Sequence, residues 1–425
     1  MGTEGWRQVV LGDVADIKIG GTPSRSEPRY WDAAKTTSNR WAAISDLKGK
    51  YLVDTAEYVS DLGVENSSVK LVPEGTVVMS FKLSIGRAAI VSQPLYTNEA
   101  IAAFYTNGEI DNEFLYYALP NTALEDAADV AVKGKTLNKA KLKEILLLLP
   151  TKGEQRKIAA ILSSVDDAIA RTQAVIDQVQ TVKKGLMQEL LTRGLPGRHT
   201  RFKKTEIGVV PEGWEVVGVG DIAAQQKYSC VGGPFGSSLT SSHYVADGVP
   251  VIRGGNLTAG RWLSEVGFAY VDSKKADELS RNLAYPGDII FTQRGTLGQV
   301  CRINPNSAHQ RFVVSQSQMK LAVNTNLFDP DFVATYFLSE LGQQQIHAAT
   351  VGTGVPHINL SMLKGFKIPK PDVSEQQAIS AIAFTLEARE RQEAKKSNGL
   401  AAVKSSLMSV LLTGQLRVTV DGDEI

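Results

Sequence analysis

The sequence predicts an α+β protein in which two homologous domains alternate with two long helices. Three observations predict this class: blocks of residues that occur twice, short segments punctuated by glycine and proline within each copy, and a heptad-patterned segment that closes each copy. On this basis the chain divides into a first domain at 1–150, a central helix at 151–195, a second domain at 196–371, a distal helix at 372–414 and a tail at 415–425.

The two domains repeat the same blocks in the same order. The segment from Trp6 to Ala15 recurs, 208 residues later, from Trp214 to Ala223. Further matching pairs are the glycine turns at 20–24 and 232–236, the segments 73–80 and 286–292, and the segments 85–90 and 297–302. Because apolar residues alternate between glycine and proline punctuation, these segments are expected to be short β-strands.

The closing segments of the two copies keep one register, with an offset of 221 at both ends. Apolar residues in the first follow alternating spacings of four and three, which is typical of a coiled-coil seam, and Val182 continues it loosely. The residues expected to pair the helices are Ile158, Leu162, Val165, Ile169, Ile176, Val179, Leu186, Ile379, Leu386, Leu400 and Leu407. An amphipathic helix lying on a globular core is the alternative.

The middle of the distal helix departs from this pattern. Glu390, Glu393 and Ser397 occupy positions that are apolar or threonine in the central helix, and Gly399 follows. This third of the helix is therefore expected to be loosely packed, kinked or covered by a partner.

Two such copies in one chain predict a pseudo-two-fold arrangement with the helices antiparallel. Dimeric DNA-binding proteins use the same symmetry to meet two half-sites. Because the two domains differ in sequence, the expected duplex DNA site is bipartite and asymmetric, with an unread gap.

Composition indicates an intracellular protein of the cytoplasm. The 425 residues carry a net charge of +1, and the two cysteines, Cys230 and Cys301, lie in no CxxC pair. No apolar run is long enough for a transmembrane helix, and the N-terminus lacks the apolar core of a signal peptide. The near-zero net charge neither favours nor excludes nucleic acid as a partner.

Catalytic and metal-binding patterns fail on inspection. Asn304-Pro305-Asn306 lacks the second proline of an amino-methyltransferase loop, and Gly134-Lys135-Thr136 lacks the leading glycine of a phosphate loop. The histidines show no metal-ligand spacing. The chain is therefore not expected to be an enzyme or to hold a metal.

The duplicated segments resemble a known family. The blocks 154–162 and 186–194, together with 211–215 and 287–298, are similar to the conserved regions of type I restriction-modification specificity subunits. The resemblance implies that each domain is a target-recognition domain for double-stranded DNA. It also implies that the helices hold two modification (methyltransferase) subunits and that a restriction subunit can join. No cofactor is then expected in this chain, because S-adenosylmethionine, ATP and Mg would bind the partner subunits.

Base and phosphate contacts need Arg, Lys, Asn, Gln, Ser or Thr on turns that reach a groove. Four loops qualify, each present in both domains. Loop 1 carries Thr22, Ser24 and Arg25, or Ser237; loop 2 carries Asn39 and Arg40, or Arg253 and Asn256. Loop 3 carries Lys82, Ser84 and Arg87, or Gln293, Arg294 and Thr296; loop 4 carries Lys133 and Lys135, or Thr353 and His357.

Each loop has a plainer interpretation. The first is an ordinary Gly-Thr-Pro-Ser turn, the lysines of the fourth are solvated charges, and His357 is a satisfied polar residue. The paired aromatics at 116–117 and 336–337 are interpreted as core residues rather than base-stacking ones. For the whole chain, the rivals are a free-standing methyltransferase or nuclease and a protein-binding scaffold whose association would be insensitive to salt.

Overall fold

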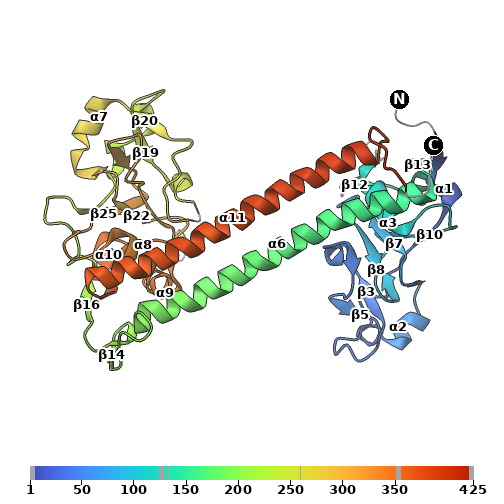
Figure 1. The fold of residues 1–425 in the computed structure, drawn as a ribbon, viewed down its shortest axis with the longest axis horizontal. Coiled ribbons are helices and arrows are strands. Elements are labelled where there is room, and N and C mark those ends of the chain that lie inside the picture. Colours follow the sequence, from blue (N-terminus) through green and yellow to red (C-terminus); the bar gives the residue numbers. More distant parts are fainter. Residues whose placement is uncertain are drawn as a thin grey trace. The chain divides into compact units, whose positions relative to one another are not determined.

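The computed structural model describes residues 5–122, 124, 129–131, 134–258, 260–350 and 356–420, with the side chains of 129–131 and 134–136 left out. The chain divides into two compact units (Figure 1): residues 1–173 with 395–425, and residues 174–394. Each long helix therefore contributes one part to each unit. None of the helices in the described ranges combines the length and the apolarity that a membrane span requires.

The first unit is built around two mixed sheets. Its elements are β1 (Arg7–Val10), α1 (Leu11–Val14), β2 (Ala15–Ile19), β3 (Arg40–Ala42), β4 (Tyr51–Leu52), β5 (Glu57–Tyr58), α2 (Asp61–Glu65), β6 (Leu71–Val72), β7 (Val77–Ser80), β8 (Ala88–Val91), β9 (Leu95–Thr97), β10 (Ile101–Thr106), α3 (Asn112–Ala118), β11 (Asp129–Ala131), β12 (Gly134–Thr136), α5 (Lys139–Lys143) and β13 (Leu146–Leu149). The sheet orders are β2-β10-β7-β8-β4 and β5-β3-β9-β6. In the second sheet, β3 and β9 run parallel.

The second unit repeats this topology. Its elements are β14 (Phe202–Thr205), β15 (Gly208–Pro211), β16 (Glu215–Gly218), β17 (Cys230–Gly232), β18 (Tyr244–Val245), β19 (Val249–Ile252), β20 (Ala269–Val271), α7 (Ser273–Glu278), β21 (Leu283–Ala284), β22 (Ile289–Thr292), β23 (Val300–Arg302), β24 (Phe312–Val314), β25 (Gln318–Leu321), α8 (Pro330–Leu338), α9 (Glu340–Ala348), α10 (Leu360–Gly365) and β26 (Lys367–Lys370). The orders β17-β25-β22-β23 and β20-β19-β24-β21 repeat β2-β10-β7-β8 and β5-β3-β9-β6 of the first unit, including the parallel pair β19 and β24. The two units differ at the sheet edges: β18 is an additional strand beside β20, and the place of β4 is taken by a single parallel bridge between Trp262 and Arg302. The duplication expected from the sequence is confirmed.

The two long helices are α6 (Lys152–Arg193) and α11 (Val373–Leu411), drawn in green and red in Figure 1. They run antiparallel within each unit. In the first unit, the Asp166 carboxylate pairs with the Lys404 ammonium at 2.6 Å; in the second, Glu390 pairs with Lys183 at 2.6 Å. The α11 helix continues without a break through Gly399.

The apolar seam of each helix faces inward. In α6, the side chains at 158, 162, 165, 169, 172, 176, 179, 183, 186 and 190 are buried or half-buried, and in α11 those at 379, 383, 386, 390, 393, 397, 400, 404, 407 and 411 are as well. The placement of Val182 in the seam is wrong, because its side chain is 48% exposed. Lys183 takes that position, since a step of four from Val179 keeps the heptad register and Glu390 neutralises the lysine.

A buried carboxylate near the start of each long helix anchors the matching domain. The Trp6 indole donates to the Glu154 carboxylate at 3.2 Å in the first unit, and the Trp214 indole donates to Glu375 at 3.1 Å in the second. Arg417 from the tail adds a bond to Glu154 at 2.7 Å. The expected core role of the paired aromatics holds for Tyr117, Tyr336 and Phe337, which are buried, and Tyr116 packs half-buried against the same core.

Candidate nucleic-acid interface

Loop 1 of each unit packs against a tight turn that joins two central strands. We call residues 98–100 and 315–317, which connect β9 to β10 and β24 to β25, the hub turns. The Gly21 amide donates to Thr97 at 2.8 Å, and the Gly233 amide donates to Gln318 at 3.0 Å. A Cβ atom built on Gly233 would lie 1.9 Å from the Ser315 carbonyl oxygen. Only glycine permits this approach, so the glycine turns fix loop 1 on the hub turns.

In the first unit the hub turn gathers three candidate residues around one carboxylate. Thr22 donates its hydroxyl hydrogen bond to Glu99. This bond, together with the nearby charges of Lys82 and Arg25, lowers the pKa of Glu99 below its ordinary value. Glu99 is therefore ionised at neutral pH, where it can position the two cations or accept a hydrogen bond from a base. Sequence reasoning missed Glu99, because nothing marks the segment Asn98-Glu99-Ala100 as more than a turn.

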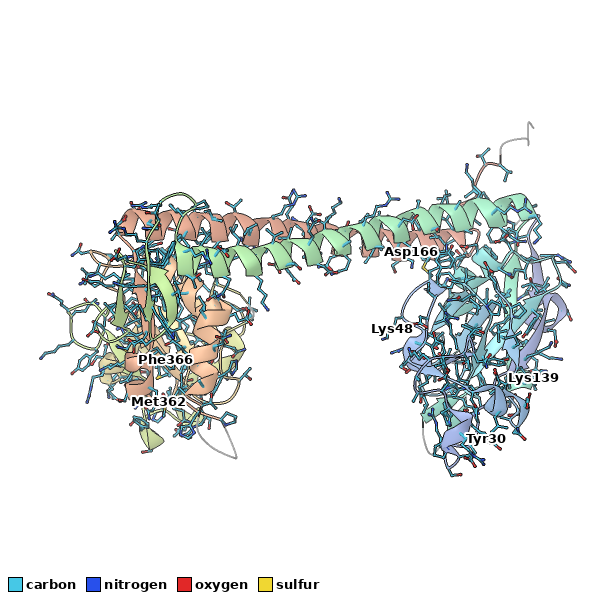
Figure 2. All side chains as sticks on the ribbon, turned by 90° about the horizontal axis from the view of Figure 1, so that it is seen from below. Tyr30, Lys48, Lys139, Asp166, Met362 and Phe366 are labelled. Carbon is cyan, nitrogen blue, oxygen red and sulfur yellow. The ribbon has the colours of Figure 1, made fainter. Side chains whose placement is uncertain are left out.

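Arg25 is held on two tryptophans. Its guanidinium lies 3.7 Å from the ring centroid of Trp31 and 5.0 Å from that of Trp41. Two bonds to Glu57, of 2.5 and 2.9 Å, fix the guanidinium plane, yet 54% of the side chain stays exposed. Tyr30, just after this loop, lies at the end of the unit remote from α6 (Figure 2). Arg25 is thus oriented in advance, as bidentate recognition requires.

Loop 2 of the first unit is less available than its sequence indicates. Asn39 donates to Asp61 at 2.7 Å, and Arg40 lies 3.4 Å from the Asp54 carboxylate and over the ring of Tyr58. The side chain of Arg40 is only 22% exposed. Both residues therefore order the domain more than they present groups to a ligand.

Loops 3 and 4 meet beside the hub turn. In the first unit, Leu137, which follows β12, donates its amide to Phe81 at the start of loop 3. In the second, Ile358 donates to Gln293 at 3.0 Å, and Arg294 forms a β-bridge with His357. The amides of Gln293 and Arg294 both donate to Ser317 of the hub turn. Residues far apart in sequence thus form one group.

Arg253 and Asn256 of loop 2 have different environments in the second unit. Asn256 is 2% exposed, and its amide nitrogen donates to the carbonyls of Ser264 and Val266. Its prediction as a base reader is wrong, because its hydrogen-bonding groups close the loop internally. Arg253 is exposed and lines a pocket of about 220 Å³ together with Tyr244 and the hub turn.

The remaining candidates fall into two groups. Exposed on the surface are Ser24, Ser84, Arg87, Ser237, Arg294 and Thr296. Lys133 and Thr353 lie outside the described residues, and of Lys135 only the backbone, in β12, is described.

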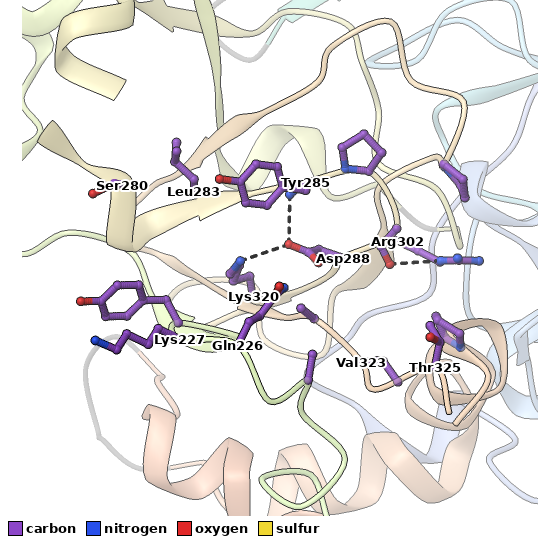
Figure 3. A pocket seen from close by; sticks show the side chains of 17 residues that line it. Gln226, Lys227, Ser280, Leu283, Tyr285, Asp288, Arg302, Lys320, Val323 and Thr325 are labelled. Atoms are coloured by element: carbon purple, nitrogen blue, oxygen red, sulfur yellow. Dashed lines mark hydrogen bonds and ion pairs between the residues drawn. The ribbon is translucent and has the colours of Figure 1, made fainter. Parts of the chain in front are cut away.

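A second concave feature of the second unit has a different character. A cavity of about 700 Å³ is lined by Asp288, Lys320 and Tyr285 among others (Figure 3). Asp288 accepts from Lys320 at 3.2 Å; burial raises its pKa, and Lys320 opposes that shift. Thr76 and Ala103 occupy the matching strand positions of the first unit, which lacks this ion pair there. The described residues include no acid, histidine or cysteine cluster able to hold a metal.

Comparison with known proteins identifies the family. A family described as type I restriction modification DNA specificity domain matches residues 3–181 and 211–402, which is most of the chain. The chain belongs to this family. As a member of the type I specificity family it recognises DNA sequence and directs a methyltransferase complex, and it is not itself an enzyme.

Individual relatives cover nearly the whole chain. The type I restriction enzyme MjaVIII specificity subunit of Methanocaldococcus jannaschii is 25% identical, over 88% of each chain. The putative MjaX specificity subunit of the same organism is 27% identical, over 98% of this chain and 94% of its own. Among solved structures, the type I restriction-modification S subunit from M. genitalium has the same fold, with a TM-score of 0.57 at 15% identity and 96% coverage of both chains.

Proposed function

We propose that each unit reads one half of a bipartite, asymmetric duplex DNA site through the loops gathered at its hub turn. The observation that carries this proposal is that equivalent loops meet at the hub turn of each unit. The same strands and glycine turns hold these loops in both units, but the loops carry different side chains. In the first unit these are Arg25, Lys82 and Glu99. In the second they are Arg253, Gln293 and Arg294. One scaffold with two sets of side chains is suited to two different half-sites.

The chemistry of these side chains suits two roles at DNA, which are reading of base edges and contact with phosphates. Arginine binds guanine in a bidentate manner, glutamine binds adenine, and a carboxylate accepts from the cytosine amino group. Arg25 and Arg294 are therefore our candidates for base reading, and Gln293 and Glu99 are further ones. The half-buried Lys82 and the exposed Arg253 are cations that suit phosphate contacts, which position the protein without reading sequence.

We further propose that the long helices hold two methyltransferase subunits and that a restriction subunit can join the assembly. The exposed outer face of α11, opposite its seam, offers such partners a surface. S-adenosylmethionine, ATP and Mg would then bind those partners.

The test is DNA binding by the chain in complex with its methyltransferase partner. We expect Arg294→Ala to weaken binding to the cognate duplex by about 5- to 150-fold, as loss of one bidentate contact of 1–3 kcal/mol implies, with little change on unrelated DNA. Arg25→Ala should act likewise through the other half-site. Arg201→Ala, which removes an exposed arginine between α6 and β14, is the control. Salt-insensitive association without DNA affinity would favour the protein-binding scaffold instead.

A further inference from the structure

Loop 3 of the first unit, residues 81–87, carries an exposed leucine in a backbone conformation that leucine rarely adopts. Leu83 has φ of 64°, in the left-handed region, and its side chain is 63% exposed. Left-handed backbone crowds the Cβ atom of an L-residue, so it is normally occupied by glycine or asparagine.

The matching loop of the second unit shows what this position ordinarily holds. Gly295 there has φ of 100°, and the next left-handed position is glycine in both loops, Gly86 at 88° and Gly298 at 86°. The closing bonds also agree: Ser80 donates its amide to Arg87 at 2.8 Å, as Thr292 does to Gln299 at 3.0 Å. The loop conformation is shared, and only the first unit places a large side chain at its tip.

The loop is held so firmly that Leu83 projects outward. Ser80 is fully buried, and its hydroxyl donates to Ser84 and accepts from the Arg87 amide at 3.1 Å. Phe81, the first residue of the loop, is 1% exposed, and its backbone amide donates to the Ala100 carbonyl of the hub turn at 3.0 Å. Leu83 therefore costs conformational strain and contacts water, and neither effect stabilises the folded chain. Such strain is commonly retained for function.

We propose that Leu83 is a specificity-determining residue that presses its apolar side chain against the bases of the first half-site. This inference rests on the proposed function. Lys82, beside it, supplies the cation that brings the loop to the phosphates, and Leu83 supplies the apolar surface. Proteins use leucine in this way as a wedge between base pairs, and apolar groups also read the thymine methyl group. Insertion as a wedge and contact with a thymine methyl group both place Leu83 against base surface. A wedge separates stacked bases, whereas a methyl contact leaves the stack intact.

The test uses the complex of the full chain with its methyltransferase partner and a duplex that carries the mapped methylation motif. Leu83→Asn keeps side-chain size and suits left-handed backbone, but removes apolarity. We expect Leu83→Asn and Leu83→Gly to lower affinity for the cognate duplex about tenfold, which is 1.4 kcal/mol, and to leave affinity for unrelated DNA unchanged. Leu83→Met should bind within about twofold of the parent, because it keeps apolar length. Leu146→Ala, which truncates an exposed leucine of β13, is the control.

Melting temperature separates a folding defect from a lost contact. Leu83→Gly removes strain but gains freedom in the unfolded chain, so its melting temperature should stay within about 2 °C of the parent. Raised 2-aminopurine fluorescence in the first half-site would identify insertion between bases, and a loss on replacing thymine by uracil would identify a methyl contact. Cognate affinity unchanged in Leu83→Asn would overturn the inference. A parent complex without cognate preference would instead overturn the proposed function, and the inference with it.

Discussion

Single carboxylates fasten each recognition domain to the helix that follows it. Glu154 is buried among the Trp6 indole, Thr151 and the Arg417 guanidinium, and Glu375 is buried among Trp214, His199 and the Leu195 amide. A buried charge is tolerated only where it is hydrogen-bonded on several sides. These two residues therefore link the first strands of a domain, the start of its helix and the segment that returns from the other helix.

Arg417→Ala should make stability depend on pH in a defined direction. Burial alone would raise the pKa of Glu154, but the bonds from Arg417 and its neighbours outweigh burial and lower that pKa. Its contribution is therefore present above the unfolded carboxyl pKa of about 4.3 and is lost as pH falls through the lower folded value. We expect Arg417→Ala to cost about 1 kcal/mol at pH 7, allowing for solvent screening of a side chain 38% exposed, and the deficit to shrink below about pH 4.

Melting curves of parent and variant across this pH range give the difference directly. Arg417→Lys keeps the charge and should retain much of the stability. A deficit that stayed constant from pH 7 to pH 3 would contradict an electrostatic role for Arg417.

Lys320→Ala should be more harmful than removing both members of its ion pair. Lys320 and Asp288 are buried to 3% and 7% exposure, so the single variant leaves an uncompensated carboxylate. Breaking such a pair costs about 3–5 kcal/mol, whereas replacing both charges is often tolerated. The double variant Asp288→Thr/Lys320→Ala installs the residues found at the matching positions of the first unit. Chemical denaturation of Lys320→Ala, Asp288→Thr and the double variant measures the coupling between the two charges. A double variant less stable than Lys320→Ala would contradict this prediction.

Residue roles were only partly predictable from the sequence. The repeat aligned Trp6 with Trp214 and Glu154 with Glu375. The contact between each tryptophan and the carboxylate of its own unit could not be predicted, because folding brings together residues far apart in sequence, such as Trp6 and Glu154, which are 148 residues apart. Loop 1 and loop 3 were recognised as candidates from composition, yet Glu99 was not, because its role comes from the non-local approach of three loops. Asn256 had the right residue type for base reading and is enclosed by its own loop.

The two long helices pair through a seam that is apolar at its ends and polar in its middle. Leu162 and Leu411 are buried in the core of the first unit, and Leu190 and Ile379 in that of the second. Between these ends, Glu390 accepts from Lys183 at 2.6 Å and from Gln180 at 2.8 Å. A polar pair inside a coiled coil specifies register at some cost in stability.

Leucines in place of this pair should therefore preserve or raise stability. We expect Lys183→Leu/Glu390→Leu to melt at or above the parent temperature, because an apolar pair avoids the desolvation of two charges. Glu390→Leu alone should melt lower, since it strands the lysine in the seam. Thermal unfolding followed by circular dichroism would give the melting temperatures of the parent, the double variant and Glu390→Leu. A double variant that melts well below the parent and below Glu390→Leu would contradict the prediction.

At the scale of elements, prediction from sequence was strongest where the pattern is local. The strands around 77–80 and 289–292 and both long helices are present where glycine punctuation and heptad spacing placed them. The seam was misread at Val182, because the true position holds Lys183, whose charge conceals the heptad. The parallel pairing of β3 with β9 was not foreseen, since it joins segments more than 50 residues apart whose partners no local pattern reveals.

At the scale of the whole molecule, one chain carries two copies of a recognition fold that have diverged at their loops. Arg25 stacks on tryptophans in one copy, and Arg294 is bridged to His357 in the other. Leu83 at the tip of loop 3 is replaced by Gly295. The order of the central strands and the anchoring carboxylates are shared, whereas the side chains differ in the loops where the proposed function places DNA. Each copy should therefore specify its own half-site independently.

The most direct measurement is a map of methylated bases in cells that carry this chain with its methyltransferase partner, compared with cells in which the chain is deleted. We expect a two-part asymmetric motif that disappears on deletion. Exchange of residues 1–150 for the corresponding domain of another family member should then change one half of the motif and leave the other intact. Methylation that is unaffected by deletion, with the partner expressed and active, would contradict the assignment of specificity to this chain.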